Sequence, residues 1–290
     1  MTTSAPPLGL LLDVDGPIAS PATRTVAAPG LVADLRTLLA AGVPVVFNTG
    51  RSDAFLRDQV VPPLLAGGLP RGARLHAVCE KGAVWTSIGP DGMGPVHVDE
   101  ALAVPLAVHE VVDELLSRYR DTMFLDGTKR SMASVEARTD VPAADYTRAQ
   151  AAFDAELVAA LTGRGLGVGY RDRQHPDDAG AVPWRVDPSV IATDVESADV
   201  GKDLGARRAL TLLSADGPLP RAWHTVGDSR SDYRMADQLH ALGHRVTHVD
   251  VRPAGPLPTT PYPVLTDPVR VDDAAGAAHL RALVVELRLG

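Results

Sequence analysis

The pattern of apolar and polar positions predicts alternating strands and helices at both ends of the chain. Short apolar runs that end in polar or glycine-rich turns alternate with segments in which apolar residues recur at helical spacing. In the first third, the expected order is strand Leu8–Leu12, helix Leu31–Ala41, strand Val43–Phe47, helix Ala54–Leu65 and strand Leu75–Cys79. In the last third, it is helix Lys202–Leu213, strand Ala222–Val226, helix Asp232–Leu242, strand Arg245–Val251 and helix Ala274–Leu289. This alternation is typical of an α/β fold whose parallel sheet is covered by helices on both faces.

The middle third has a different pattern. Apolar residues at helical spacing predict helices near Val108–Tyr119 and Tyr146–Leu161. Each helix precedes two predicted strands, which are Thr122–Leu125 and Ser131–Ala137 after the first and Gly167–Arg173 and Trp184–Ala192 after the second. The order αββαββ predicts an α+β module over an antiparallel sheet. We therefore expect one discontinuous core domain, residues 1–88 and 194–290, with a second domain, residues 89–193, inserted into it.

Composition narrows the classes of function. The 290 residues include 28 Lys and Arg against 36 Asp and Glu, a formal net charge of −8. This balance speaks against broad binding to nucleic acids or anionic membranes. The single cysteine, Cys79, lies in a predicted buried strand and cannot form an internal disulfide, which fits a reducing compartment. No apolar stretch approaches the ~18–20 residues of a membrane-spanning helix, so we expect a cytoplasmic protein without membrane contact.

Two acidic clusters directly follow predicted strands. Asp13 and Asp15 come after the first strand, and residues two apart in an extended backbone point to the same side. Asp228 and Asp232 follow the strand Ala222–Val226, where a helix is expected to begin. Ligands of open α/β sheets bind beyond the carboxyl ends of the strands, and close carboxylates repel unless a cation or a shared proton relieves them. Together the four residues predict a site for an oxygen-preferring ion such as Mg²⁺. Taken singly, each motif also fits a surface turn or a helix cap.

Two further segments have residue types that bind phosphate. Thr49 and Gly50 follow the second predicted strand, where a hydroxyl and backbone N–H groups at a helix start can hold an anion. Lys202 stands at the start of a predicted helix. An ordinary helix N-cap and a solvated surface lysine are the alternatives for these residues taken alone.

These segments resemble, in their order along the chain, the motifs of the haloacid dehalogenase superfamily of phosphohydrolases. They are Asp13-Val14-Asp15-Gly16, Asn48-Thr49-Gly50-Arg51, Gly201-Lys202 and Gly227-Asp228-Ser229-Arg230-Ser231-Asp232. The resemblance implies a Rossmann-like core with an inserted α/β cap, as in the branch of Cof-type phosphatases, sucrose- and trehalose-phosphate phosphatases and phosphomannomutases. Glu80-Lys81-Gly82-Ala83 resembles the segment that leads into the cap in that branch. Pro17 departs from the pattern, because it replaces a usual threonine and so removes a hydroxyl and a backbone N–H.

The resemblance also implies a role for each matched residue. Asp13 is expected to be the nucleophile that forms an aspartyl-phosphate, and Asp15 the general acid and base. The residues expected to hold Mg²⁺ are Asp13, Asp15 through its backbone carbonyl, Asp228 and Asp232. Those expected to bind the phosphoryl oxygens are Thr49, Gly50 and Lys202.

Four basic residues are candidates for contact with the rest of the substrate. Arg51 follows the expected phosphate loop, whereas Lys129, Arg130 and Arg185 lie in the predicted insert. Arginine can grip a sugar hydroxyl or a second anionic group, although the three insert residues also fit a charged, solvent-facing sheet.

The sequence therefore predicts a Mg²⁺-dependent phosphatase for a small phosphate ester, a sugar phosphate or a related polyol phosphate. We expect a monomer or a small homo-oligomer. Two alternatives remain, a phosphomutase of the phosphomannomutase type and a non-catalytic sugar-phosphate-binding protein. Release of inorganic phosphate would distinguish the phosphatase from the phosphomutase and from the binding protein.

Overall fold

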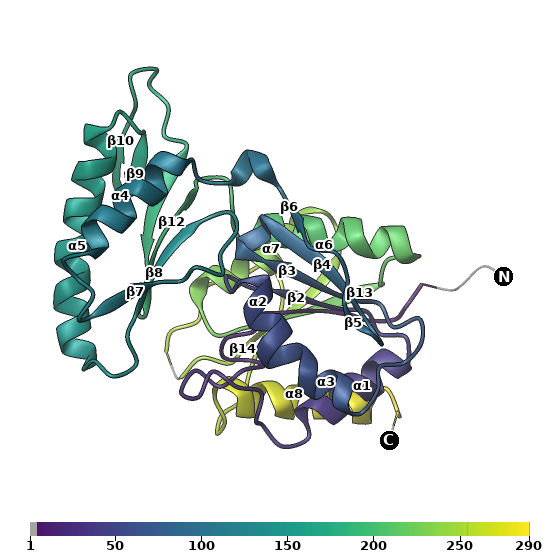
Figure 1. Cartoon of the computed structure of the whole chain (residues 1–290). Coiled ribbons are helices and arrows are strands. Elements are labelled where there is room, and N and C mark those ends of the chain that lie inside the picture. The colour runs from purple at the N-terminus through teal and green to yellow at the C-terminus, as the bar shows by residue number, and fades with distance from the viewer. Residues whose placement is uncertain (1–4, 254, 290) are drawn as a thin grey trace. The chain divides into compact units, whose positions relative to one another are not determined.

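The chain folds into two units. The computed structural model describes residues 5–253 and 255–289. One unit, the core, comprises Met1–His97 and Gly201–Gly290, and the other, the insert, comprises Val98–Val200 (Figure 1). Helices in the described part of the chain are all too short or too polar to cross a membrane.

The core is built on a mainly parallel sheet. Its strands are β1 (Gly9–Leu12), β2 (Val45–Asn48), β3 (Leu75–Cys79), β4 (Val84–Gly89), β5 (Gly92–Met93), β6 (His97–Val98), β13 (Ala222–Gly227), β14 (Arg245–Asp250) and β15 (Val264–Thr266). The strand order is β15-β14-β13-β1-β2-β3-β4-β5, with β6 beside β4. The pairs from β15 to β3 are parallel, and β4 runs antiparallel to β3 and β5. The central strands β1, β2 and β3 are buried along their whole length, as their nearly continuous apolar sequences require.

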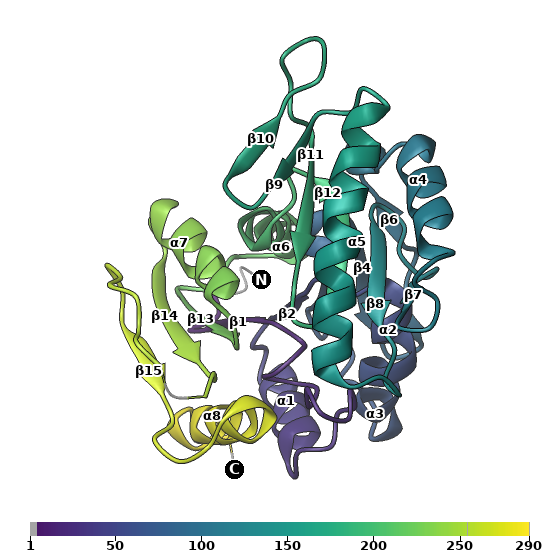
Figure 2. The same ribbon diagram turned by 90° about the vertical axis from the view of Figure 1, so that its left-hand side faces the viewer.

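Helices cover both faces of the core sheet, as Figures 1 and 2 show. The helices are α1 (Leu31–Ala40), α2 (Asp53–Phe55), α3 (Val61–Ala66), α6 (Lys202–Asp216), α7 (Tyr233–Ala241) and α8 (Asp272–Glu286), with a π-helical turn at Leu56–Val60 between α2 and α3 and 3₁₀ turns at Glu80–Gly82 and Arg230–Asp232. Helices α6 and α7 pack together on one face, and α1 and α8 pack together on the other. The predicted α/β class with a Rossmann-like core is confirmed.

The insert places two helices on one face of a six-stranded sheet. Its elements are a 3₁₀ turn (Glu100–Leu102), α4 (Leu106–Leu116), β7 (Met123–Leu125), β8 (Ala133–Ala137), α5 (Ala143–Gly163), β9 (Val168–Tyr170), β10 (Arg173–His175), β11 (Trp184–Pro188) and β12 (Ala192–Ser197). The strand order is β10-β9-β11-β12-β8-β7. Apolar residues of both helices, including Val108, Val112, Phe153 and Leu157, form the core of this unit.

The insert differs from the predicted αββαββ order in two respects. Two predicted segments each divide into two strands, which yields β9 with β10 and β11 with β12. The sheet is also mixed rather than antiparallel, because β11 runs parallel to β9. The reason is the tight hairpin from β9 to β10, which turns the chain back at the sheet edge, so that β11 returns beside β9 in the same direction.

The boundaries between the units also lie later than the expected 88/89 and 193/194. They fall after His97 and after Val200. At the first boundary, β5 and β6 pair with β4 and so extend the core sheet. At the second, β12 continues to Ser197 on the insert sheet. Strands β5 and β6 have only two residues each, too few for a clear apolar periodicity, so sequence patterns place them poorly.

Candidate active site

Two adjacent parallel strands bring the acidic clusters together. Strands β1 and β13 pair in register with Leu12 beside Val226, so the residues that follow them leave the sheet at the same edge. The Asp13 backbone N–H donates to the Val226 carbonyl at 2.9 Å. Gly16 then takes a φ of +85°, and a Cβ atom there would lie 2.5 Å from Asp228 Cβ. Glycine is therefore required for the Asp13–Gly16 loop to pass close to Asp228.

Lys202 lies at the centre of this cluster and is almost fully buried. Its Nζ lies 2.7 Å from Asp13 Oδ1 and 2.7 Å from Asp232 Oδ1. It also donates to the Asn48 carbonyl at 2.8 Å, while Asn48 Nδ2 donates to the Lys202 carbonyl at 2.8 Å. Burial opposes the charge of Lys202, but Asp13 and Asp232 outweigh it and raise the lysine pKa above its ordinary value. The lysine therefore carries its charge over the whole working range of pH.

Asp232 is held in place by the start of the helix that follows β13. Its Oδ2 accepts hydrogen bonds from the Ser229 N–H at 2.9 Å and the Ser229 hydroxyl at 2.7 Å. Burial works against the ionised form, yet Lys202 and these two donors lower the pKa of Asp232. Asp232 is fully buried, so its carboxylate is fixed in position by these bonds.

Three carboxylates of this cluster can hold a metal ion. One oxygen atom each from Asp13, Asp228 and Asp232 lies within 4.8 Å of the others. Burial and the charge of Asp232 raise the pKa of Asp228 to about 7, and the same two causes raise the pKa of Asp13. Such shifts mark negative charge that the protein alone does not neutralise. An oxygen-only donor set with excess negative charge suits a hard divalent cation.

The Thr49 loop brings a hydroxyl and a guanidinium to the same edge of the sheet. Thr49 Oγ1 accepts the Arg51 backbone N–H at 3.1 Å, which leaves the Thr49 hydroxyl hydrogen free to donate elsewhere. Arg51 binds Asp15 with two nitrogens, Nε at 2.8 Å from Oδ2 and Nη2 at 2.9 Å from Oδ1. Gly50, between them, lies against the side chain of Lys81. Arg51 was predicted to contact substrate, and the structure shows it oriented by Asp15.

Comparison with known proteins bears on the fold. No protein-family model matches the chain, and no curated protein matches its sequence. Among solved structures, the C-terminal domain of trehalose-6-phosphate phosphatase from C. albicans superimposes with a TM-score of 0.66 at 16% identity, over 97% of this chain and 94% of that one. A trehalose-6-phosphate phosphatase related protein matches with a TM-score of 0.57 at 12% identity, over 97% and 100% of the two chains. A haloacid dehalogenase-like hydrolase from Bacteroides thetaiotaomicron matches with a TM-score of 0.57 at 11% identity, over 95% and 98%. The chain has the haloacid dehalogenase fold.

The fold confirms the resemblance found in the motifs, and the structure brings the matched core residues together. Asp13, Asp228, Asp232 and Lys202 form one cluster, and Thr49 is linked to it through Asn48, whose carbonyl Lys202 binds. The catalytic and ligand roles of these residues, and the backbone carbonyl of Asp15 as a metal ligand, stay predictions.

The three insert candidates belong to the other unit. Lys129 and Arg130 lie in the turn between β7 and β8. Arg185, on β11, binds Glu196 Oε1 through Nε at 2.8 Å and donates to the Val200 carbonyl at 2.9 Å. Glu196 is buried, so this ion pair braces β11 against β12 and the segment that leaves the insert. Arg185 therefore has a structural role, and contact of all three with substrate stays a prediction.

Sequence reasoning gave no site role to Lys81, whose backbone connects the Thr49 loop with the segment that begins α6. Its backbone N–H donates to the Thr49 carbonyl at 3.0 Å, and its carbonyl accepts the Gly201 N–H at 2.7 Å. Glu80 and Lys81 have φ values of 48° and 55°, which are unusual for residues other than glycine. Such strain persists only where surrounding contacts enforce it. The two left-handed residues could not be found from composition, because neither is a glycine or an asparagine.

Asp272 is a further acidic residue that the sequence analysis overlooked. It begins α8 with a φ of 50°, and its negative charge contributes to the raised pKa of Asp228. Its backbone N–H donates to the Val251 carbonyl at 2.8 Å, which fixes it beyond the end of β14. One helical turn later, Gly276 contacts the Pro17 carbonyl directly, so α8 packs against the loop that carries Asp13 and Asp15. Pro17 is thus accommodated in a packed turn.

Proposed function

We propose that this protein is a phosphatase that hydrolyses small phosphate monoesters with the help of Mg²⁺. The observation that carries the proposal is the position of Asp13. Its carboxylate lies beside buried Lys202 and within reach of Asp228 and Asp232, at the carboxyl ends of parallel strands. A nucleophile there has a cationic neighbour for the phosphoryl oxygens and an acidic set for a metal, as phosphoryl transfer requires.

Each residue of the cluster has a distinct part in the proposed reaction. Asp13 attacks phosphorus and becomes an aspartyl-phosphate, while the bond to the leaving oxygen breaks. Asp15 gives a proton to that oxygen and later takes one from the water that hydrolyses the intermediate. Lys202 and the Thr49 hydroxyl bind the phosphoryl oxygens. Asp13, Asp228 and Asp232 hold Mg²⁺, which supplies positive charge that offsets the crowded carboxylates and the phosphoryl group.

Arg51 orients Asp15 in this scheme. The two-nitrogen contact fixes the plane of the Asp15 carboxylate. The contact occupies both carboxylate oxygens of Asp15, so the substrate's arrival has to loosen this pair before Asp15 can reach the leaving oxygen. A phosphate oxygen or a sugar hydroxyl can do so by competing for the guanidinium.

We infer that the substrate is a sugar phosphate. The support is that two of the similar structures are a trehalose-6-phosphate phosphatase domain and a protein related to that enzyme, and that the likeness spans nearly all of each chain, the insert included. A polyol phosphate has the same hydroxyl-rich chemistry and is the natural second member of a substrate panel.

Phosphate release from a panel of sugar, polyol, nucleotide and glycerate phosphates tests the proposal. The wild type should release inorganic phosphate with Mg²⁺ and not with EDTA, with sugar phosphates among the best substrates. Asp13→Asn should release none, and its melting temperature should stay close to that of the wild type because the side chain keeps its size. Release that survives EDTA, or an active Asp13→Asn variant, would show that the proposed chemistry is wrong.

A further inference from the structure

A second group of polar side chains lies at the edge of the core sheet opposite the acidic cluster. Strands β1, β2 and β3 are parallel, and the acidic cluster lies at their carboxyl ends, whereas His76 stands near the start of β3. Helix α6 joins the two places, because it begins at Lys202 and ends at Asp216. A helix of 15 residues spans roughly 21 Å. A change near Asp216 should therefore leave the acidic cluster undisturbed.

His76 connects a serine with a carboxylate in this second group. It pairs with Ser87 across β3 and β4, so the two side chains lie on the same face of the sheet. His76 Nδ1 lies 2.9 Å from Ser87 Oγ, and His76 Nε2 lies 2.7 Å from Asp216 Oδ2. The imidazole is buried and the Asp216 carboxylate is partly exposed. Ser87 is exposed on β4, so a molecule from solvent can reach its hydroxyl.

These two contacts imply where the imidazole carries its hydrogen. A carboxylate only accepts hydrogen bonds, so Nε2 carries the hydrogen and donates it to Asp216. Nδ1 is then the acceptor, and the Ser87 hydroxyl donates to it. Burial lowers the pKa of His76 and the charge of Arg74 lowers it further, although Asp216 opposes both, so the ring is neutral near neutral pH. A neutral imidazole that accepts a serine hydroxyl is a general base beside a nucleophile.

The three side chains line a cavity of about 630 Å³ in the core. Arg74 lines it too, and its Nη1 and Nη2 donate to the carbonyls of Pro218 at 2.9 Å and Gly217 at 3.3 Å. These bonds hold the guanidinium in place, where its positive charge acts on His76. A cavity of this size accepts a small molecule.

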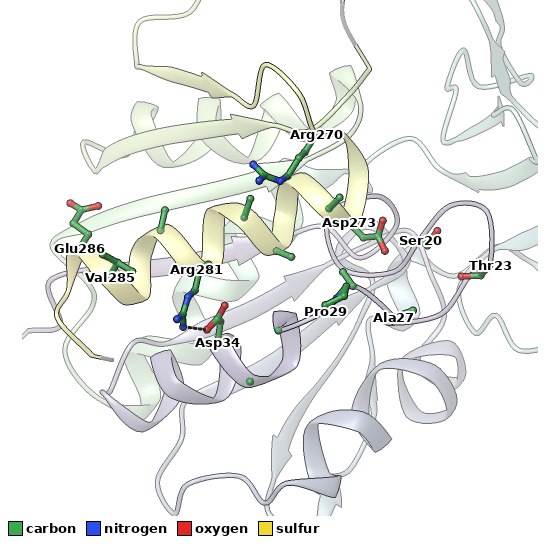
Figure 3. Close-up of a pocket in the computed structure, with 17 residues that line it drawn as sticks. Ser20, Thr23, Ala27, Pro29, Asp34, Arg270, Asp273, Arg281, Val285 and Glu286 are labelled. Carbon is green, nitrogen blue, oxygen red and sulfur yellow. Dashed lines mark hydrogen bonds and ion pairs between the residues drawn. The ribbon is translucent and has the colours of Figure 1, made fainter.

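A larger groove between α1 and α8 lacks this combination of side chains (Figure 3). Most of its lining residues are small and apolar, and Arg281 points toward Asp34 and pairs with it at 3.2 Å. No histidine is among the described residues that line the groove, so Ser20 and Thr23 have no imidazole base there. The contact between a nucleophile and an imidazole therefore distinguishes the cavity at Ser87.

We propose that Ser87, His76 and Asp216 form a second active site, which hydrolyses small carboxylic esters. Ser87 Oγ bonds to the carbonyl carbon of the ester while the hydroxyl proton passes to His76 Nδ1. The positive charge of Arg74 stabilises the oxyanion, and Asp216 stabilises the imidazolium. The bond to the alcohol oxygen then breaks, and the alcohol leaves with the proton from Nδ1. Water attacks the acyl-serine in the same way, and the carboxylic acid and the free serine are released.

The charges of the cavity favour an uncharged ester over a phosphate ester. One guanidinium can offset the single negative charge that develops on an ester carbonyl. A phosphoryl group spreads more negative charge over its oxygens, and the Asp216 carboxylate repels it. Pro6 and Ile88 also line the cavity and provide apolar contacts for a short acyl chain.

Hydrolysis of 4-nitrophenyl acetate in EDTA tests this site apart from any Mg²⁺-dependent phosphatase activity. The wild type should release 4-nitrophenolate, and Ser87→Ala should lower the enzymatic rate on the order of 100-fold. Ser214→Ala is the matched control and should keep the wild-type rate. Ser214 is exposed two residues before Asp216, and its hydroxyl donates to the Thr211 carbonyl of its own helix. A wild type no faster than Ser87→Ala, or an equal loss in Ser214→Ala, would overturn the proposal.

Asp216→Asn tests the positioning role of the carboxylate through the pH profile. The variant should hydrolyse the ester on the order of 10-fold more slowly, because the imidazole is no longer held in the required tautomer. The acidic limb of its pH profile should also move to lower pH, because Asp216 raises the pKa of His76 and Arg74 then acts on it unopposed. A slower variant with an unmoved limb would show that Asp216 has only a structural role.

A fluorophosphonate reagent provides a second measurement that does not depend on the choice of ester. An activated serine oxygen bonds to its phosphorus, fluoride leaves, and the hydroxyl proton passes to the base. Mass spectrometry of the digested wild type should find the label on the peptide that contains Ser87. Ser87→Ala should stay unlabelled and melt close to the wild type, because the position is exposed. No label on the wild type, or label on another peptide only, would contradict the role of Ser87 as a nucleophile.

Discussion

The carboxylates of the acidic cluster lie close together, and the repulsion between their charges lowers the stability of the folded protein. Asp13, Asp228 and Asp232 lie within reach of one ion, and Lys202 neutralises only part of their charge. The motifs predicted the three aspartates because they follow strands that end at the same sheet edge, whereas Lys202 was predicted from its place in the order of motifs, at the start of a helix. They did not predict the pairing of Arg51 with Asp15, since only the folded loops determine where a long flexible side chain lies.

Asp228→Asn should therefore separate stability from metal binding. The pKa of Asp228 is raised to about 7, so the folded protein resists its ionisation, and wild-type stability falls as pH rises from about 4 to about 7. Without metal, the variant should be more stable than the wild type by on the order of 3 kcal/mol above pH 7 and equal to it below pH 4. Urea unfolding with EDTA at both pH values measures this difference.

Added Mg²⁺ supplies the control for that prediction. It should raise the melting temperature of the wild type and have little effect on Asp228→Asn, because one of three carboxylate ligands is gone. Equal stability of the two proteins at high pH without metal would mean that burial and the neighbouring carboxylates do not disfavour the ionised form of Asp228.

At the scale of elements, close packing between a helix and a strand positions Lys202. Gly205 lies in α6 one turn after Lys202, and a Cβ atom there would collide with the Asn48 side chain. Asn48 ends β2 and is joined to Lys202 by two hydrogen bonds. Sequence patterns predicted α6 and β2 nearly to their bounds but could not show that their contact requires a glycine, since such contacts join residues far apart in the chain.

Gly205→Ala should lower stability although alanine is the better helix former. The clash should cost about 1–3 kcal/mol in the free energy of unfolding and lower kcat/KM through Lys202. Gly163→Ala is the matched control, because Gly163 ends α5 and has open space around it. That change should stabilise by a few tenths to about 1 kcal/mol. Urea unfolding of both variants decides the matter, and equal effects would refute the packing argument.

At the scale of the whole molecule, one sheet is assembled from the two ends of the chain. Strands β1 to β3 come from the first third and β13 to β15 from the last, and the pairing of β1 with β13 joins them. The alternation of long apolar strands and amphipathic helices predicted this division, because buried parallel strands have a strong signal. The short strands β5, β6 and β10 have no such signal, because they are partly exposed and have little apolar periodicity. Strands β5 and β6 set the first boundary and the end of β12 precedes the second, and both boundaries lie later than the sequence pattern predicted.

A covalent phosphate on Asp13 tests the central claim most directly. A single turnover of ³²P-labelled substrate with Mg²⁺, stopped in acid and digested, should leave label on the peptide that contains Asp13, and hydroxylamine should remove it as it removes acyl phosphates. Once label has formed, Asp15→Asn should lose it more slowly than the wild type, because the base that activates water is lost while Asp13 remains. Turnover without label in either protein, or label on another peptide, would contradict the role of Asp13 as the nucleophile.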